Sequence, residues 1–227
     1  MSEFMQNSVF WGVALSFVAY GIGMLLQKKF RLAIFNPLLI SVILIMFFLN
    51  ISKTDYKVYQ EGADVISYFL TPATVCLAIP LYEQMELLKK NFKAIMIGIL
   101  LTSLVSVLAM SVFFGLNHKE YTTLLPKSIT TAIGMGVSEE LGGYVTLTVA
   151  IIIITGILGS ILAEVAWKVF HITEPIAKGV AIGTASHAIG TSKAMEMGET
   201  EGAISGLSIA VAGLLTVAGA SIFACFL

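Results

Sequence analysis

Two short polar stretches interrupt an otherwise apolar chain, and they hold most of the side chains that could do chemistry. One stretch runs from Gly183 to Thr191 and contains two glycines, two threonines, a serine and a histidine. The other runs from Leu125 to Thr131 and adds a proline and a lysine. Irregular backbone of this kind survives at membrane depth only where protein or a watery cavity surrounds it. We therefore interpret the two stretches as parts of a binding site inside a membrane protein.

Lys127 gives the second stretch its most specific chemistry. An ionisable group at hydrocarbon depth is costly and usually marks a functional site. If Pro126 begins a short helix, the free N–H groups of its first turn, the positive end of the helix dipole and the ammonium would together favour an anion. The carboxylate of a small organic acid fits that description. The alternative is that Lys127 reaches the membrane surface or pairs with Glu83 or Glu164.

His187 is the only histidine expected at membrane depth, because His118 and His171 fall in loops. An imidazole titrates close to neutral pH, so His187 could take up a proton and couple transport to a proton gradient. The alternative is a neutral, buried histidine that hydrogen-bonds to the backbone. No second histidine, cysteine or carboxylate lies at ligand spacing, so we expect no metal and no cofactor.

Ser186 beside His187 does not make a catalytic pair. Adjacent residues of a helix point away from each other, and a hydrolase needs a nucleophile, a base and an orienting group within mutual reach. We therefore expect that the protein is not an enzyme.

The composition indicates that lipid surrounds most of the chain. Of the 227 residues, 57% are hydrophobic and only 12% are charged, against roughly 25% charged in an ordinary soluble domain. The formal net charge is −1, so the chain lacks the basic footprint of a protein that binds nucleic acid.

Helices must position the two polar stretches. A membrane helix needs about 20 mostly apolar residues, and spans are expected near 8–26, 33–51, 64–82, 93–115, 144–167 and 203–226. The polar stretches belong to two shorter segments, 123–138 and 178–194. The sequence thus predicts an all-α, polytopic membrane protein with six to eight membrane segments, some of them broken or re-entrant.

The distribution of lysine and arginine suggests an orientation, because short cytoplasmic loops are rich in both. The basic connections around Lys28 and Lys89 belong inside, which puts the N-terminus and the 116–122 loop outside. Segment 123–138 either crosses fully or enters and returns. The re-entrant version is favoured, since it keeps the acidic Glu139-Glu140 turn outside. We expect the C-terminus inside.

A faint internal repeat at an offset of about 110 residues divides the single domain 1–227 into pseudo-repeats 1–116 and 117–227. It aligns 64–82 with 178–194 and 93–115 with 203–226, and the matched spans would run in opposite directions. Inverted repeats of this kind are typical of secondary transporters, whose binding sites form where broken helices meet near the membrane midplane.

Several motifs resemble the LrgB/CidB family. They are Asn36-Pro37-Leu38-Leu39, Pro80-Leu81-Tyr82-Glu83-Gln84, the Leu125–Thr131 and Gly183–Thr191 stretches, and Glu201-Gly202-Ala203. The resemblance covers nearly the whole chain in matching order. One departure is Ala132, where relatives commonly have a proline after the two threonines.

The resemblance implies a multi-pass protein of the bacterial cell membrane, described as holin-like or antiholin-like, with an LrgA/CidA-like membrane partner. Related proteins include a plastid glycolate/glycerate translocator, and bacterial pairs are implicated in pyruvate movement. The family motifs also imply a set of substrate-binding residues: Lys127, Ser128, Thr130, Thr131, Thr184, Ser186, His187, Thr191 and the outlying Asn36.

Three functional interpretations follow. The first is a carrier of small monocarboxylates that works by alternating access, with the anion on Lys127 and the hydroxyls and a coupled proton on His187. The second is a holin-like pore or an antiholin that controls murein hydrolase activity and lysis. The third is a non-transporting partner of another membrane protein. A homodimer is compatible with glycine-bearing helix faces such as Gly179 and Gly183.

Overall fold

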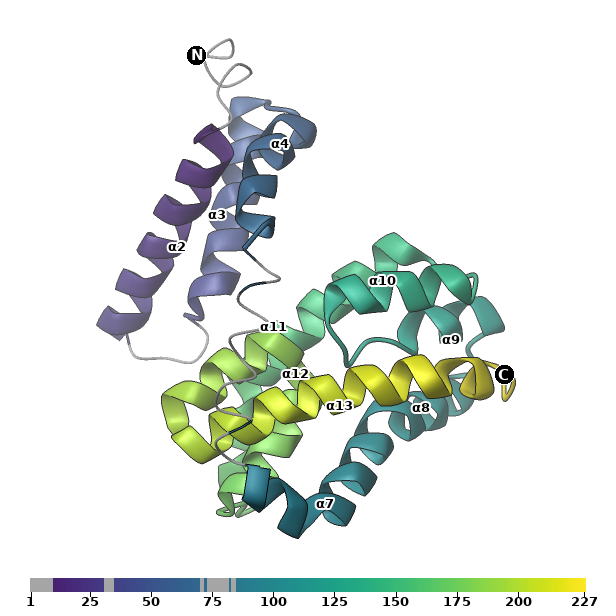
Figure 1. Cartoon of the computed structure of the whole chain (residues 1–227). Helices are drawn as coiled ribbons and strands as arrows, with labels where there is room; N and C mark the ends of the chain where they lie inside the picture. Colours follow the sequence, from purple (N-terminus) through teal and green to yellow (C-terminus); the bar gives the residue numbers. More distant parts are fainter. Residues whose placement is uncertain (1–9, 31–34, 70–71, 73–81, 83–84) are drawn as a thin grey trace. The chain divides into compact units, whose positions relative to one another are not determined.

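All regular elements in the described part of the chain are helices (Figure 1). The computed structural model describes residues 10–30, 35–69, 72, 82 and 85–227. Four helical spans in these ranges are long and apolar enough to cross a membrane. They are α2 (Phe10–Phe30), α11 (Val145–Val169), α13 (Glu199–Ala224) and the composite span 89–114. The predicted all-α, polytopic membrane fold is confirmed.

The chain divides into two compact units, Met1–Cys76 and Leu77–Leu227, which are described separately. In the first unit, α2 packs against α3 (Pro37–Ser52) and α4 (Tyr56–Ser67). Glycines allow the close approach, since a Cβ on Gly12 would meet the backbone of Tyr59 and one on Gly23 that of Pro37. Small residues thus form the contacts between helices, as they do in lipid.

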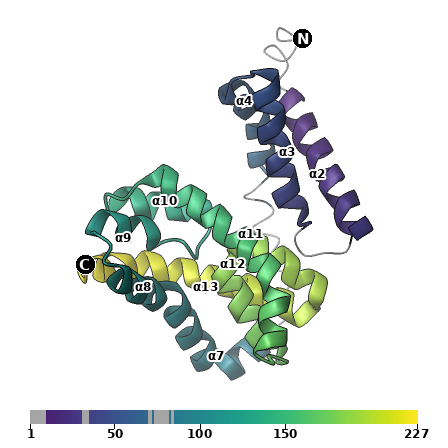
Figure 2. The same ribbon diagram turned by 180° about the vertical axis from the view of Figure 1, so that it is seen from behind.

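The second unit begins with a composite span. It consists of α7 (Met85–Leu100), a short π-helix η1 (Leu101–Val105) and α8 (Ser106–Phe114). After it come α9 (His118–Leu124), α10 (Thr131–Glu140), α11, α12 (Pro175–Met197) and α13, which crosses the body and ends beside α8 (Figures 1 and 2).

The second unit buries apolar and hydroxyl-bearing side chains together and exposes large apolar ones. Its core contains residues such as Ile99 and Leu104, and the hydroxyl-bearing residues Ser103, Thr148, Thr184, Ser205 and Ser208 are also fully buried. Its exposed side chains include Phe113, Leu158 and Leu214. Small hydroxyl-bearing residues between helices and apolar outer faces fit helices that contact lipid.

Most predicted spans match helices. The third, 64–82, lies mostly outside the described residues, and so does Glu83. Its first residues, up to Ser67, belong to α4, which begins at Tyr56 with Asp55 as its N-cap.

Residues 118–140 form a helical hairpin, called hairpin A, that enters the body and returns. Thr148 of α11 joins its two arms, because the Thr148 hydroxyl lies 2.9 Å from the carbonyl oxygen of Thr123 and 2.7 Å from the hydroxyl of Ser138. Between the arms, residues 125–130 make irregular turns. Both arms therefore contact the same turn of α11, near its start, as the re-entrant interpretation of 123–138 predicts.

Residues 175–197, which make up α12, form a second hairpin, called hairpin B. The backbone of His187 leaves the helical region with φ 39° and ψ −134°. Beyond this point the chain turns back, because a Cβ on Gly190 would stand 2.8 Å from the carbonyl oxygen of Ile182. Further along, Ala194 packs in one cluster with Ile182 and with Ala163 and Trp167 of α11. The segment 178–194 is thus re-entrant as well.

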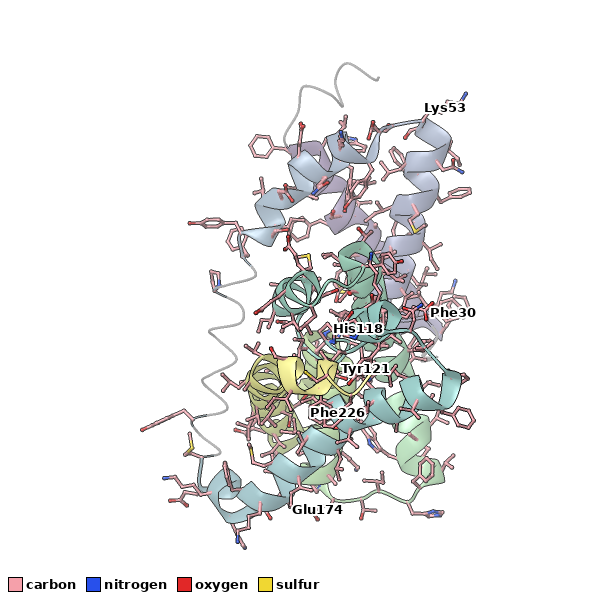
Figure 3. The ribbon with its side chains drawn as sticks, turned by 90° about the vertical axis from the view of Figure 1, so that its right-hand side faces the viewer. Phe30, Lys53, His118, Tyr121, Glu174 and Phe226 are labelled. Carbon is pink, nitrogen blue, oxygen red and sulfur yellow. The ribbon has the colours of Figure 1, made fainter. Side chains whose placement is uncertain are left out.

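One predicted pair of locations is wrong. The sequence analysis placed the 116–122 loop and the C-terminus on opposite sides of the membrane. In the structure both lie at one end of the second unit, because the Tyr121 hydroxyl donates to the carbonyl oxygen of Phe223 at 3.0 Å. Figure 3 shows Tyr121 beside Phe226, with Glu174 far from both. The reason is that segment 178–194 returns instead of crossing.

The composite span 89–114 and α13 both end beside α9, so they run in the same sense and not in the opposite senses expected (Figures 1 and 2). Hairpin A contacts the first turn of α11, whereas hairpin B contacts its last turns. The division into pseudo-repeats 1–116 and 117–227 stays a prediction.

Candidate functional site

The tips of the two hairpins meet on one turn of α11. The hydroxyl of Thr155 lies 3.4 Å from the carbonyl oxygen of Lys127 at the tip of hairpin A. On the same turn, three residues earlier, the carbonyl oxygen of Ile152 lies 2.8 Å from Nε2 of His187 at the tip of hairpin B. At about 1.5 Å per residue, this turn is roughly 10 to 15 Å from the start of α11. The two predicted polar stretches therefore come together near the middle of a membrane-length helix.

Lys127 is half-buried at the tip of hairpin A, and Nζ donates to the hydroxyl of Ser128 at 2.9 Å. Its predicted alternative partner Glu164 pairs instead with Lys193, 2.9 Å away. Among the described residues, no carboxylate neutralises Lys127. The ammonium is thus available for an anion at the place where the tips meet.

His187 is 3% exposed and has a backbone conformation that non-glycine residues rarely adopt. Such a conformation costs on the order of 1–3 kcal/mol and concentrates at functional sites. A carbonyl oxygen can only accept, so Nε2 must carry the proton that bonds to Ile152. Gly156 makes room for the ring, since a Cβ there would stand 2.7 Å from Nε2. In the described part of the chain, Nδ1 has no hydrogen-bond partner.

Ser186 is fully buried, and its hydroxyl has no hydrogen-bond partner in the described part of the chain. The side chain lies between Gly159 of α11 and Gly190 in the first turn of the returning arm, where added Cβ atoms would collide with it. An orphaned buried hydroxyl calls for an explanation, such as an unseen ligand or water. Ser186 therefore leaves a buried hydroxyl without a partner at the beginning of the returning arm, in the part of the chain that the structure describes.

Both returning arms begin at the tips, so their N-terminal ends converge there. Thr130 is the N-cap of α10 and accepts from the N–H of Gly134 at 2.8 Å, but its side chain makes no capping bond. Thr131 follows as the first helical residue. At the second tip, residues 188–190 follow the break at His187. Each N-terminal end presents free N–H groups and a partial positive charge.

Other predicted site residues have structural roles. The Thr184 hydroxyl bonds back to the carbonyl oxygen of Val180 at 2.7 Å. The Thr191 hydroxyl joins hairpin B to α13 through Ser205 at 2.7 Å. Asn36 belongs to the first unit, where its side chain caps α3 by accepting from the N–H groups of Leu38 and Leu39.

The sequence analysis missed the α11 residues that receive the tips: Ile152, Thr155, Gly156 and Gly159. They lie in an apolar run that looks like an ordinary span. The triplet Ala-Ile-Gly occurs at 132–134, at 181–183 and at 188–190, so it is shared by the two polar stretches but does not single out their tips.

The chemistry of the tips suits a small anion. One ammonium, two helix N-termini and several hydroxyls converge, while the described residues contain no cluster of His, Cys, Asp or Glu able to hold a metal ion. The site therefore offers positive charge and hydrogen-bond donors in a buried position.

Comparisons with known proteins give one consistent result. The LrgB-like family model matches residues 16–226. The chain is similar to the antiholin-like protein LrgB of Bacillus cereus (strain B4264) and to the protein of the same name from Bacillus anthracis (strain CDC 684 / NRRL 3495). Each is 37% identical over 212 residues, which cover 92% of this chain and 92% of the relative. No solved structure matches the chain.

Proposed function

Because this chain belongs to the LrgB-like family, we propose that it carries small monocarboxylates, such as glycolate, glycerate or pyruvate, across a bacterial cell membrane by alternating access. The observation that carries the proposal is the meeting of two re-entrant tips on one turn of α11, with Lys127 unpaired between them among the described residues. A buried, water-poor site of this kind is where the binding sites of secondary transporters form.

The charge of the tips favours a monovalent anion. Lys127 supplies one full positive charge, and the N-terminal ends of the two returning arms supply partial charges. A single carboxylate would leave the site close to neutral, whereas a dianion would bring a second, uncompensated charge into a low-dielectric interior. The hydroxyls of Ser128, Thr130, Thr131 and Ser186 supply hydrogen bonds to the remaining oxygens of the substrate.

His187 is the candidate for a coupled proton. Its Nε2–H is committed to the carbonyl oxygen of Ile152, so Nδ1 is the nitrogen that can gain or lose a proton. A proton on Nδ1 would strengthen anion binding, and its release would weaken it. Substrate and proton would then move together.

An antiholin-like role is the second candidate, and a specific observation favours it. The relatives that match over 92% of their length carry that name. In this function the protein would modulate murein hydrolase activity and lysis with an LrgA/CidA-like partner or as a homodimer. A regulator that acts only through its outer faces has no need of an unpaired lysine at membrane depth, and for this reason we prefer the carrier.

For the membrane orientation, we propose that the end with Lys89, Lys168 and Lys178 is cytoplasmic, following the positive-inside rule. The C-terminus and the α9 end then face outside. Cysteine labelling of Lys119→Cys and Lys178→Cys in intact cells tests this assignment.

Uptake into proteoliposomes tests the function. We expect saturable uptake of labelled pyruvate or glycolate, and loss of that uptake in Lys127→Met with normal membrane insertion. Lys119→Met is the matched control, because Lys119 lies over the Tyr144 ring at the end of the body. Leakage of dye without saturation would indicate a pore instead. The absence of both uptake and leakage would favour the regulatory role.

A further inference from the structure

The two hairpin tips have the same short sequence. In hairpin A the triplet Ala132–Gly134 follows Thr130 and Thr131, and in hairpin B the triplet Ala188–Gly190 follows Ser186 and His187. Each tip therefore reads as a hydroxyl-bearing residue, one variable residue, and Ala-Ile-Gly. A match of three residues is weak by itself, and the same triplet also occurs at 181–183 in the first arm of hairpin B. The packing of the triplets must therefore decide whether the match has structural meaning.

The packing of the two triplets shares one feature. A Cβ on Gly134 would stand 3.5 Å from the carbonyl oxygen of Pro126, an ordinary contact distance, and one on Gly190 would stand 2.8 Å from that of Ile182. In both hairpins the glycine thus faces the backbone eight positions earlier, in the opposite arm. At Gly190 the approach is close enough to require glycine, whereas at Gly134 the closest contact is the side chain of Ile152. The two hairpins therefore share the way in which their arms return, but not the closeness of their packing.

The bases of the hairpins are held at opposite ends of α11. Hairpin A is held near the start of the helix, where the hydroxyl of Thr148 contacts Ser138 of the returning arm. Hairpin B is held near the end of the helix, where Glu164 pairs with Lys193 of the returning arm. The arms of hairpin A therefore lie between the tips and the α9 end of the body. The arms of hairpin B lie between the tips and the Glu174 end.

We propose that the two hairpins are duplicated halves of one anion site, each contributing a helix N-terminus and a hydroxyl, and that each hairpin is the gate to its own end. Thr130 and Ser186 are the equivalent positioning hydroxyls. Movement of α10 away from Thr148 opens the site toward the α9 end, and movement of residues 188–197 away from Glu164 opens it toward the Glu174 end. This inference rests on the proposed carrier function and adds the assignment of gates.

Ser186 supports the placement of the anion. Its hydroxyl is buried, has no partner in the described part of the chain, and lies against the first turn of the returning arm. A helix N-terminus with such a hydroxyl beside it can bind a carboxylate oxygen through both groups. The unpaired ammonium of Lys127 lies on the side of the other tip.

Reversible cross-links can hold each gate shut. In a full-length background with Cys76 and Cys225 replaced by alanine, lock A is Ser138→Cys with Thr148→Cys, closed by oxidation. Lock B is Glu164→Cys with Lys193→Cys, closed by a short bis-methanethiosulfonate reagent that reductant removes. Each reduced double variant and each single cysteine variant is the control for folding.

We expect closure of either lock to abolish uptake of labelled pyruvate and reductant to restore it, while binding of the label is retained. Label bound to protein with lock A closed should be displaced only from the side of Lys178, and with lock B closed only from the side of Lys119. Uptake that persists with a closed lock, or displacement from the same side for both locks, would overturn the gate assignment. If the unlocked parent shows no saturable uptake, the carrier function itself fails, and that result is distinct from a failure of the gates.

Discussion

His187 donates a hydrogen bond from Nε2 to the carbonyl oxygen of Ile152, 2.8 Å away on α11. This bond fixes the tip of hairpin B against a helix that also contacts Lys127 of hairpin A through Thr155. The same imidazole thus has one nitrogen with a structural role and one available for a proton. The two roles can be separated by substitution.

His187→Gln should retain substrate binding but lose the stimulation of uptake by a pH gradient. A glutamine amide can still donate toward Ile152, but it cannot take up a proton in this pH range. Uptake of labelled pyruvate with and without an acid outside compartment measures the effect. Equal stimulation in His187→Gln and the parent would remove His187 from the coupling role.

His187→Ala should reduce stability as well. The loss of a buried hydrogen bond costs about 1–3 kcal/mol when a partner is left unsatisfied. The cost here should lie toward the low end of this range, because Ile152 lies inside α11, where its carbonyl oxygen also accepts from the backbone N–H four residues later. Thermal unfolding in detergent, with His187→Gln as the comparison, measures the difference.

Gly190→Ala should destabilise hairpin B by about 1–3 kcal/mol, the usual cost of overpacking. The added methyl group would stand 2.8 Å from the carbonyl oxygen of Ile182, and backbone cannot move aside as a side-chain end can. Gly136→Ala is the control, since a Cβ there meets nothing within 4 Å. Thermal unfolding should show a loss for Gly190→Ala only. An equal effect of both substitutions would contradict the close packing of the arms.

Tyr121 should make the protein sensitive to high pH. Burial raises the pKa of Tyr121 to about 12, and its hydroxyl donates to Phe223 only while it is protonated. The unfolded chain has a pKa near ~10, so this contribution is fully present below that pH and is lost as pH rises toward 12. Unfolding measured at pH 8 and pH 11 should show a loss of stability that Tyr121→Phe reduces.

The sequence was sufficient to predict that the two polar stretches are buried inside the protein, but not the shape that they take. Hydroxyls, glycines and a lysine in a hydrophobic chain indicate buried polar backbone, and for that reason Lys127 and His187 were paired in advance. The reversal at His187 could not be predicted, because no proline or glycine occupies that position and the strain is stabilised by contacts with Ile152 and Gly156. Periodicity alone describes 178–194 as one segment and cannot tell a crossing from a return. The expected separation of the C-terminus from the 116–122 loop, which the structure does not show, follows from this one ambiguity.

In the first unit, the sequence predicted the start of one helix but not that of the next. The start of α3 follows from Asn36-Pro37, since an N-cap followed by proline is a local signal. The start of α4 at Asp55 was missed because residues 56–63 are polar and resemble a loop. Whether Asn36 contributes to substrate binding remains a prediction, and uptake by Asn36→Ser, which keeps a capping oxygen, tests it.

Ser186 and Thr191 should respond to alanine substitution in opposite ways. Both are buried hydroxyl-bearing residues of hairpin B, but the Ser186 hydroxyl has no partner in the described part of the chain, whereas that of Thr191 bonds to His187 and Ser205. Removal of an unsatisfied buried hydroxyl relieves a desolvation penalty, so Ser186→Ala should unfold at the same temperature as the parent or a higher one. Thr191→Ala should lose about 1 kcal/mol, the usual net value of a hydrogen bond. Substrate affinity should show the reverse order, because only Ser186 is free to bind the anion. Reduced stability in Ser186→Ala with unchanged affinity would mean that the serine is structural, and the anion would then have to bind elsewhere along the tips.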